Sequence, residues 1–488
     1  MRDESMEFSV ALAASVHATA SNHLVRADGQ EDLAFGIWFP SHGLARDSGL
    51  LQRIILPQED DREVHGNASF SGQYFVRAAC EAAAVGGGLA FMHSHPGPGW
   101  QDMSTPDRRA EEKHAGPTLA ITGKPLLGLT LGTDGTWSAR FWPRVRSKTY
   151  QPAWCSTVRI IGKGLRISYH PRLVPRYRHQ QQLVRTVSFW GRAAQEHLGR
   201  MRVGIAGLGS VGSLVNECLA RMGVRTIVQI DFDRVKVHNL DRITGATARD
   251  AAAHAFKVNV AARNAREAAT ASQFLAIPRT LSVVEVEGYR AALDCDVIFS
   301  CVDRPWARRV LNHIAYSHLI PVVDGGILVR NPGGKFRNAY WSARIAGPER
   351  SCLECAGSYD PGLVSAERDG YLEDPSYISE LPDDSPLRRN ENVFPLSMSL
   401  AAHEVLQFVA LTTGLVGMYD TGEQRFSYFP GYLESHPVSC ETNCPFPSLT
   451  ALGEKADQSV GPFTGRHAAA DAERASDQKT RSQSRKTP

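Results

Sequence analysis

The sequence predicts an α/β protein built from two units, and three observations carry that prediction. Short apolar runs alternate with amphipathic helical patterns in both halves of the chain. A basic, irregular stretch at 146–175 separates the two alternating systems. The length of 488 residues is sufficient for about two to four domains, each with its own core. We therefore expect domains at 1–145 and 176–452, a linker at 146–175 and a disordered tail at 453–488.

Composition excludes several classes of protein. The 54 basic and 51 acidic side chains leave a net charge of +3, too small to indicate nucleic-acid binding. The sequence contains no run of about 18 apolar residues, so it predicts no transmembrane helix. Phe8–Ala20 lacks the basic region that precedes a signal peptide's apolar segment. Nine cysteines are an odd number, which argues against a disulfide framework and for a reducing, cytoplasmic compartment.

The first unit is expected to hold a buried sheet with helices on it. The Asp134-Gly135 pair suits a tight hairpin turn. The predicted elements are a helix within 10–30, strands at 33–39 and 50–57, a helix at 74–84, a strand at 88–96 and a hairpin at 126–142.

The second unit is expected to be a parallel, doubly wound sheet, because its strands alternate with helices. The tail after about residue 453 has few bulky apolar residues and should be disordered. The predicted elements are strands at 201–209, 226–233, 295–303 and 320–326, and helices at 213–223 and 397–411.

A metal-ligand pattern ends the strand at 88–96. His93 and His95 are two positions apart on a strand and project to the same side. Asp107, at the start of the next helix, can add a carboxylate. Three protein ligands and a water form the catalytic zinc pattern, in which zinc lowers the pKa of the water. The alternative is that the histidines are polar strand-end residues and Asp107 caps a helix.

The order H-x-H-P…S-x-x-D resembles the signature of JAB/JAMM zinc isopeptidases over about residues 5–145. The resemblance implies a JAB/MPN-like α/β metalloprotease domain with Glu31 as general acid/base and Ser104 stabilising the oxyanion. Asp32 and Glu63 are weaker candidates for the acid/base. Eight residues separate His95 from Ser104, one more than is usual in the family, so the substrate groove there is expected to differ.

A glycine-rich turn opens the second unit. Gly207, Gly209 and Gly212 follow a strand and begin a helix, as in turns that approach phosphates. Asp231 ends the next strand, where a carboxylate can accept ribose hydroxyls, and Asp233 follows it. On this pattern alone a dinucleotide site would be the default.

The residues that follow favour a triphosphate instead. Asn239, Arg242 and Lys257 place an amide and two cations beyond the second strand, which suits a nucleotide that loses pyrophosphate. Asp303 ends a later strand, where it can hold Mg²⁺. The alternative is that the cations lie on the solvated surface and Asp303 caps a helix.

Together these residues resemble the ThiF/MoeB adenylyltransferase family, which is related to ubiquitin-activating enzymes, over about residues 176–450. The resemblance implies a Rossmann-like adenylation domain that binds ATP and magnesium. It implies that Arg242, Lys257 and Asp303 are catalytic. Arg185 resembles the family arginine that reaches into a partner subunit's site, with Arg178 as the competing choice, so a two-fold homodimer is expected.

Two cysteine pairs, Cys352/Cys355 and Cys440/Cys444, are typical of a structural tetrathiolate zinc site. The alternative is redox-active or free thiols. No cysteine lies between the pairs, where activating enzymes carry a thioester cysteine. The reaction is therefore expected to stop at the acyl-adenylate, with Ser385 or Ser397 as alternative acyl acceptors.

Both resemblances lead to one substrate class, a ubiquitin-like or sulfur-carrier protein that ends in glycine. We expect zinc-dependent cleavage after that glycine and ATP-dependent adenylation of its carboxylate, in a pathway of the bacterial type with a downstream conjugating enzyme as a further partner. Maturation and removal of conjugates both remain open as the purpose of cleavage. One alternative is adenylation of a peptide or small-molecule carboxylate. The other is a nucleotide-binding scaffold that serves the metalloprotease.

Overall fold

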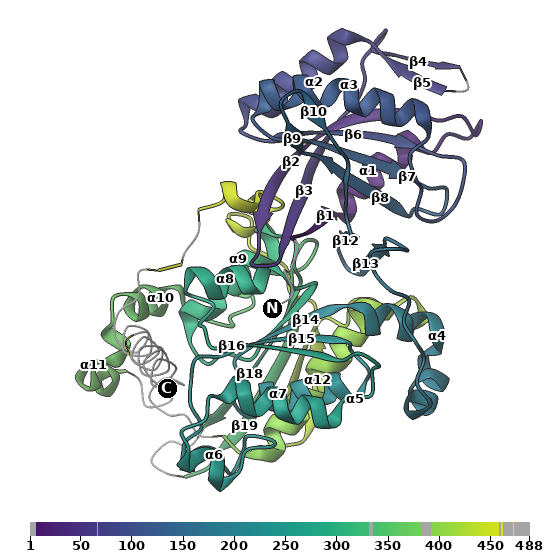
Figure 1. Cartoon of the computed structure of the whole chain (residues 1–488). Coiled ribbons are helices and arrows are strands. Elements are labelled where there is room, and N and C mark those ends of the chain that lie inside the picture. Colours follow the sequence, from purple (N-terminus) through teal and green to yellow (C-terminus); the bar gives the residue numbers. More distant parts are fainter. Residues whose placement is uncertain are drawn as a thin grey trace, which may run out of the picture.

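The computed structural model describes residues 6–65, 67–330, 335–381, 392–457, 460–461 and 472. The chain forms two α/β units, one around a nine-stranded sheet and one around an eight-stranded sheet. Figure 1 shows the N-terminal unit in purple and blue and the C-terminal unit in teal and green. We call the part from β1 to β13 the N-terminal unit and the part from α4 onward the C-terminal unit.

The N-terminal unit has the sheet order β11-β8-β7-β6-β2-β3-β1-β12-β13. Its helices are α1 (Ala14–Leu24), α2 (Gly72–Ala84) and α3 (Thr105–Thr122). Its strands are β1 (Glu7–Ala13), β2 (Leu33–His42), β3 (Arg46–Ile55), β4 (Arg62–His65), β5 (Asn67–Phe70), β6 (Gly88–Ser94), β7 (Leu126–Leu131), β8 (Trp137–Trp142), β9 (Arg144–Arg146), β10 (Thr149–Tyr150), β11 (Ala153–Trp154), β12 (Thr157–Ile161) and β13 (Leu165–Tyr169).

Helices cover both faces of this sheet. α2 and α3 pack on each other and on β2, β6 and β7, whereas α1 packs on β1, β3 and β12. The strand β6 is buried along its whole length between these layers. Ser104 begins α3 with a reciprocal capping pair to Asp107, and Gly123 ends the helix in a left-handed conformation. The cap places Asp107 in the first turn of α3, beside the end of β6.

Residues 146–175 differ from the predicted connector. β12 pairs in parallel with β1, Ser9 opposite Thr157 and Ala13 opposite Ile161, so this segment completes the N-terminal sheet. Residues 10–13, predicted to lie in the first helix, instead end β1, because this strand pairs with β3 on one side and with β12 on the other. Pairing across more than a hundred residues overrode the local helical pattern.

The C-terminal unit confirms the predicted doubly wound sheet. Its order β16-β15-β14-β17-β18-β19-β20-β21 is parallel up to β18, with the strand order of a Rossmann-like fold. Its helices are α4 (Val184–Arg200), α5 (Ser210–Arg221), α6 (Ala248–Ala252), α7 (Lys257–Ala268), α8 (Val286–Leu293), α9 (Pro305–Ser317), α10 (Pro361–Arg368), α11 (Pro375–Glu380) and α12 (Phe394–Thr413). Its strands are β14 (Arg202–Ala206), β15 (Thr226–Ile230), β16 (Leu275–Arg279), β17 (Val297–Ser300), β18 (Val322–Arg330), β19 (Asn338–Ala346), β20 (Glu423–Ser427) and β21 (Tyr432–His436).

One helix of the described chain, α12, has the length and apolar composition to cross a membrane. Its most apolar window has a mean hydropathy of 1.3, and 56% of that window is buried in the protein. α12 packs on α5, β18 and β19. These contacts are those of a core helix that covers one face of the sheet.

The beginning of the predicted tail is ordered. Residues Gly453–Lys455 form a short 3-10 helix that packs on β2. Glu454 accepts a hydrogen bond from the backbone N–H of His42 at 3.1 Å. The rest of the tail, apart from 456–457, 460–461 and 472, lies outside the described residues.

Candidate functional site

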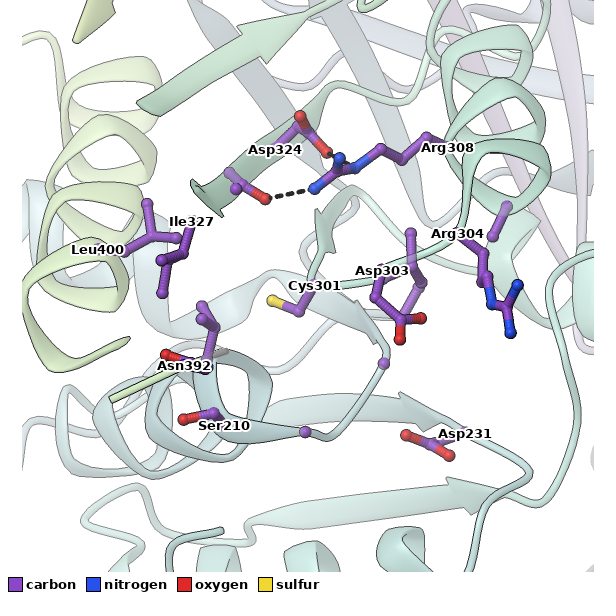
Figure 2. Close-up of a pocket in the computed structure, with 18 of the residues that line it drawn as sticks. Ser210, Asp231, Cys301, Asp303, Arg304, Arg308, Asp324, Ile327, Asn392 and Leu400 are labelled. Atoms are coloured by element: carbon purple, nitrogen blue, oxygen red, sulfur yellow. Dashed lines mark hydrogen bonds and ion pairs between the residues drawn. The ribbon is translucent and has the colours of Figure 1, made fainter. Parts of the chain in front are cut away.

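A cavity of about 830 Å³ opens at the carboxyl ends of β14, β15, β17 and β18. In doubly wound folds this edge of the sheet is where ligands bind. Figure 2 shows Asp231 and Asp303 on separate segments that border the same hollow. The predicted nucleotide-site residues that line it are Gly207, Gly209, Asp231, Asp233, Asn239, Arg242, Lys257 and Asp303.

The glycine turn is shaped by close packing. Gly207 has φ +87°, and a Cβ there would lie 2.5 Å from the carbonyl oxygen of Cys301. A Cβ on Gly212 would lie 2.0 Å from the carbonyl oxygen of Gly207. Gly212 thus packs the helix against the turn and does not line the cavity, whereas Gly209 borders the cavity at the start of α5. A helix start of this kind presents backbone N–H groups to an anion.

Asp231 is held rigidly beside that turn. Its Oδ2 accepts a hydrogen bond from the N–H of Leu208 at 2.6 Å, and its Oδ1 accepts one from the N–H of Asp233 at 2.7 Å. The residue is 8% exposed, and burial raises the pKa of the carboxyl. The carboxylate is fixed at the cavity wall, where it can accept ribose hydroxyls.

Lys257 is a buried cation at the cavity. Its Nζ lies 2.9 Å from Asp233 Oδ2. Burial alone would lower the pKa of Lys257, but the charges of Asp231, Asp233 and Asp303 more than offset it and raise the pKa. The ammonium group therefore stays charged at neutral pH, as a site for phosphate requires.

Asn239 ends the short 3-10 helix Val237–Asn239, and Arg242 lies three residues further along the chain. Asn239 Oδ1 accepts a hydrogen bond from the N–H of Lys236 at 3.0 Å. Arg242 donates from Nη1 to the carbonyl of His238 at 2.7 Å and to Asp241 at 2.8 Å. These bonds orient both side chains at the cavity. Asp303 is exposed there, and its carboxylate oxygens are of the type that Mg²⁺ prefers.

Arg308 and Asp324 are among the cavity residues that were not predicted. Arg308 Nε lies 3.3 Å from Asp324 Oδ1, and its Nη2 donates to the carbonyl of Gly325 at 2.8 Å (Figure 2). A Cβ on Gly326 would lie 3.1 Å from Arg308 Nη2, so the glycine leaves room for the guanidinium. The only signal in the sequence was that Asp324 lies near the end of the strand predicted at 320–326. The sequence did not show which elements would pack beside that strand.

Arg185 and Arg178 are both exposed, and neither is among the described residues that line the cavity. Arg185 lies on the first half of α4, which breaks at Gly191 with φ +85°. That half exposes Val184 (66%) and Phe189 (76%). The role of Arg185 in a second subunit remains a prediction.

His93, His95 and Asp107 converge as predicted. The Nε2 atoms of the histidines are 3.2 Å apart, and Asp107 oxygens lie 3.1 Å from His95 Nε2 and 3.6 Å from His93 Nε2. Zinc bonds of about 2.0–2.2 Å in a tetrahedron separate ligands by about 3.4 Å. Burial opposes ionisation of Asp107, but hydrogen bonds with both histidines hold the pKa of its carboxyl well below the usual range. The donor set therefore fits a zinc ion.

The residues around this triad have different surroundings. Glu31 lies two residues before β2, in which Leu33 is opposite His93, so it lies at the same edge of the sheet. Asp32 is buried, and its Oδ1 lies 2.9 Å from Arg62 Nε, which gives it a structural role. Glu63, on β4, is exposed.

Ser104 serves as the helix cap. Its Oγ accepts a hydrogen bond from the N–H of Asp107 at 3.2 Å, and its own N–H donates to Asp107 Oδ2 at 2.8 Å. The alternative raised from the sequence was that Asp107 caps this helix; Ser104 is the N-cap residue, and Asp107 is the other member of the capping pair. The hydroxyl hydrogen is still available to donate to an oxyanion.

The two cysteine pairs meet, with all four sulfurs within 4.8 Å of one another. Cys352 Sγ and Cys444 Sγ are 3.6 Å apart, close to the ~3.8 Å that tetrahedral zinc–sulfur bonds of ~2.3 Å produce. Backbone N–H groups of Cys352 and Cys355 donate to sulfurs of the cluster, to Cys440 and Cys352, each at 3.2 Å. All four are free thiols. The set fits a tetrathiolate zinc site.

Ser397 is fully buried. Its Oγ accepts a hydrogen bond from Ser210 Oγ at 2.7 Å and donates to Asn392 Oδ1 at 3.0 Å. A buried hydroxyl engaged in this way is poorly suited to accept an acyl group. Ser385 lies outside the described residues.

Comparisons with known proteins place a ThiF family domain at residues 179–419. The matched range covers the cavity residues from Gly207 to Asp303. It begins after the N-terminal unit, which the match does not include.

Curated proteins similar to this chain include three kinds of enzyme. Ubiquitin-like modifier-activating enzyme 5 of Drosophila willistoni is 25% identical over 183 residues, 35% of this chain and 42% of that protein. tRNA threonylcarbamoyladenosine dehydratase 2 of Saccharomyces cerevisiae is 32% identical over 148 residues, 30% of this chain and 32% of that protein. Molybdopterin-synthase adenylyltransferase of Escherichia coli is 30% identical over 152 residues, 31% of this chain and 57% of that protein.

This chain thus covers about two fifths of the length of the activating enzymes that it matches. Among solved structures, Escherichia coli MccB with ATP is similar with a TM-score of 0.42 and 17% identity, over 55% of this chain and 75% of that chain.

Proposed function

We propose that the ThiF family domain at residues 179–419 adenylates the carboxyl-terminal glycine of a ubiquitin-like or sulfur-carrier protein. A carboxylate oxygen attacks the α-phosphorus of ATP, the bond to the leaving pyrophosphate breaks, and an acyl-adenylate forms. The observation that supports this most is the buried Lys257, held as a cation by Asp233 at the cavity wall. A fixed cation there stabilises charge that develops on the phosphates.

The other cavity residues supply complementary roles. Asp231 binds the ribose, while Asn239 and Arg242 hold the phosphates. Asp303 holds magnesium, which neutralises charge on the triphosphate when bound. The start of α5 at Gly209 directs N–H groups at an anion.

Relatives named for activation of a ubiquitin-like modifier and for adenylyl transfer to molybdopterin synthase support a protein substrate. A peptide or small-molecule carboxylate is the alternative for the same site. The discriminating experiment is ATP–pyrophosphate exchange with a panel of purified carriers that end in glycine. Carrier-dependent exchange supports the proposal, exchange with a small carboxylate favours the alternative, and no exchange leaves only a nucleotide-binding scaffold.

We further propose a homodimer in which Arg185 completes the partner's site. The exposed apolar residues Val184 and Phe189 on the same half of α4 support an interface there. The site of one chain alone lacks this arginine among its described lining residues. A chain that is monomeric by light scattering, yet fully active, would contradict the dimer.

For the N-terminal unit we propose zinc-dependent hydrolysis of the amide or isopeptide bond after the carrier's terminal glycine, as in JAB/JAMM isopeptidases. The convergence of His93, His95 and Asp107 favours it. Bound zinc would supply a hydroxide at neutral pH. Glu31 would transfer the proton, and Ser104 would donate to the oxyanion.

The cysteine cluster is proposed as a second, structural zinc site. It ties the loop that follows β19 to the segment that follows β21. The test of both zinc proposals is the metal content of the purified protein together with cleavage of a glycine-linked carrier fusion. Cleavage that survives substitution of His95 would contradict the hydrolase.

A further inference from the structure

A chain of buried polar groups lies directly behind the His/His/Asp cluster. Arg140, on β8, is fully buried and donates from Nη1 to Thr130 Oγ1 at 2.7 Å. The same guanidinium donates from Nε to Glu111 Oε2 at 2.9 Å and from Nη2 to Glu111 Oε1. Trp142 Nε1 also donates to Glu111, at 2.5 Å. The hydrolysis chemistry proposed above assigns no role to Thr130, Arg140 or Glu111.

One end of this chain contacts a metal ligand. Thr130 on β7 is the register partner of His93 on β6. Thr130 Oγ1 lies 3.4 Å from His93 Nε2, the nitrogen that faces His95 and Asp107. Because Arg140 donates to Thr130 Oγ1, the hydroxyl is held in place against the imidazole ring of His93.

The other end of the chain anchors the helix that carries the third ligand. Glu111 and Asp107 are four residues apart on α3 and therefore lie on the same face of the helix. The ion pair between Glu111 and Arg140 fastens that face to the sheet. A Cβ on Gly128 would lie 2.3 Å from Glu111 Oε2 and 2.8 Å from Arg140 Nε, so the absence of a side chain on β7 makes room for the pair.

The imidazole ring of His93 has few other contacts that could fix its orientation. Its Nδ1 is buried and has no hydrogen-bond partner among the described residues. Metal-binding histidines usually have that second nitrogen held by a carboxylate or a carbonyl. Apart from stacking on Phe91, the described polar contact on its ring from outside the ligand set is Thr130.

Stability alone does not account for the buried ion pair between Arg140 and Glu111. Removing two charges from water costs about as much as their attraction returns, so an apolar replacement is often as stable. A role in fixing geometry accounts for a fully buried arginine at this place. The same guanidinium reaches the threonine beside His93 and the helix that bears Asp107.

We propose that Thr130, Arg140 and Glu111 are positioning residues that set the spacing between His93 on β6 and Asp107 on α3, and thereby the affinity and geometry of the metal site. The inference rests on the proposed zinc-dependent function. It concerns how the chain orders its ligands, and it predicts effects on metal binding in the absence of any substrate.

The central variant is Thr130→Val, which removes the hydroxyl and keeps the shape. We expect the zinc dissociation constant, measured by chelator competition, to rise about 10- to 100-fold, as for loss of other groups that orient ligands. The absorption spectrum of the Co²⁺-loaded protein should change in band position or intensity. Arg140→Lys keeps the charge but cannot bridge both partners, and it should weaken zinc binding similarly.

The controls separate positioning from folding. Thr118→Val changes another fully buried threonine, on α3, whose Oγ1 has no partner among the described residues, and it should leave zinc affinity unchanged. Thr130→Ser restores the hydroxyl and should restore affinity and spectrum. Equal zinc affinity and an equal Co²⁺ spectrum in wild type and Thr130→Val would overturn the positioning role but leave the hydrolase proposal standing. A wild-type protein that binds no zinc through His95 would overturn the hydrolase proposal as well.

Discussion

Arg46 and Asp296 form a buried ion pair across the boundary between the two units, with Arg46 Nη1 2.6 Å from Asp296 Oδ1. Arg46 begins β3, and Asp296 directly precedes β17. Asp296 Oδ2 also accepts a hydrogen bond from the N–H of Arg202, the first residue of β14. The N-terminal unit is thus attached at the amino ends of β14 and β17. The cavity of the candidate site lies at the carboxyl ends of the same strands.

This pair predicts a large stability effect from Arg46→Met. Without Arg46, Asp296 would lose its nearest counter-charge and keep Arg159, whose Nε lies 3.9 Å from Asp296 Oδ1. We therefore expect the free energy of unfolding to fall by about 3 kcal/mol, the lower end for a broken buried pair. Chemical denaturation followed by fluorescence measures it. Arg53→Met is the control, because Arg53 pairs with Glu81 at the surface, where a pair contributes about 0–1 kcal/mol. Equal losses in the two variants would contradict the prediction.

Asp303→Asn should lower carrier-dependent ATP–pyrophosphate exchange by about 10²- to 10³-fold, since it weakens magnesium binding at the phosphates. Higher Mg²⁺ should recover part of the rate. Asp369→Asn, at an exposed position at the end of α10, is the matched control and should retain full exchange. A rate for Asp303→Asn that is low at every Mg²⁺ concentration would point to a role other than metal binding.

Arg185 can be tested by complementation between subunits. Arg185→Ala and Lys257→Ala should each be inactive alone. In a mixed dimer, the chain with intact Lys257 can receive Arg185 from its partner, so one complete site forms. We expect partial exchange activity to return on mixing. If the mixture stays inactive while mixed dimers are detected by native mass spectrometry, Arg185 acts within its own chain.

Metal analysis should find two zinc ions per chain in the full protein. His95→Ala should lose one, and Cys352→Ser with Cys355→Ser should lose the other. The cysteine variant is expected to unfold at a lower temperature, because zinc binding contributes to folding free energy. The melting temperature of His95→Ala should be closer to that of the wild type than the melting temperature of the cysteine variant is. The same zinc content in both variants and the wild type would refute the assignment of the ligands.

His313 predicts a loss of stability in acid. Burial, with help from the charge of Arg309, lowers the pKa of His313 to about 4, against about 6.5 in the unfolded chain. The folded protein thus holds the neutral form, and the unfolded chain takes up the proton first. The contribution of neutral His313 to the free energy of unfolding is complete above pH 6.5. It falls as the pH drops toward 4, by at most about 3 kcal/mol. His313→Gln should flatten the curve of unfolding free energy against pH over that range, and an unchanged slope would exclude His313 as a source.

Local pattern was sufficient for the features that depend on neighbours in sequence. The turn at Gly207 follows a strand and opens a helix, the histidines at positions i and i+2 share one side, and the cysteine pairs lie on short loops. Each is set by backbone geometry within a few residues, so the sequence predicted the glycine turn, both clusters of candidate metal ligands and the doubly wound sheet.

Tertiary structure decided what depends on residues far apart. β12 was hidden because its partner, β1, lies about 150 residues earlier, and no periodicity within a window reports such pairing. Arg308 and Asp324 meet only because α9 packs on β18. Thr130, Arg140 and Glu111 come from two strands and a helix, and they look like ordinary polar residues until the fold buries them. Burial turns their charges and hydrogen bonds into strong constraints, and burial is a property of the folded chain alone.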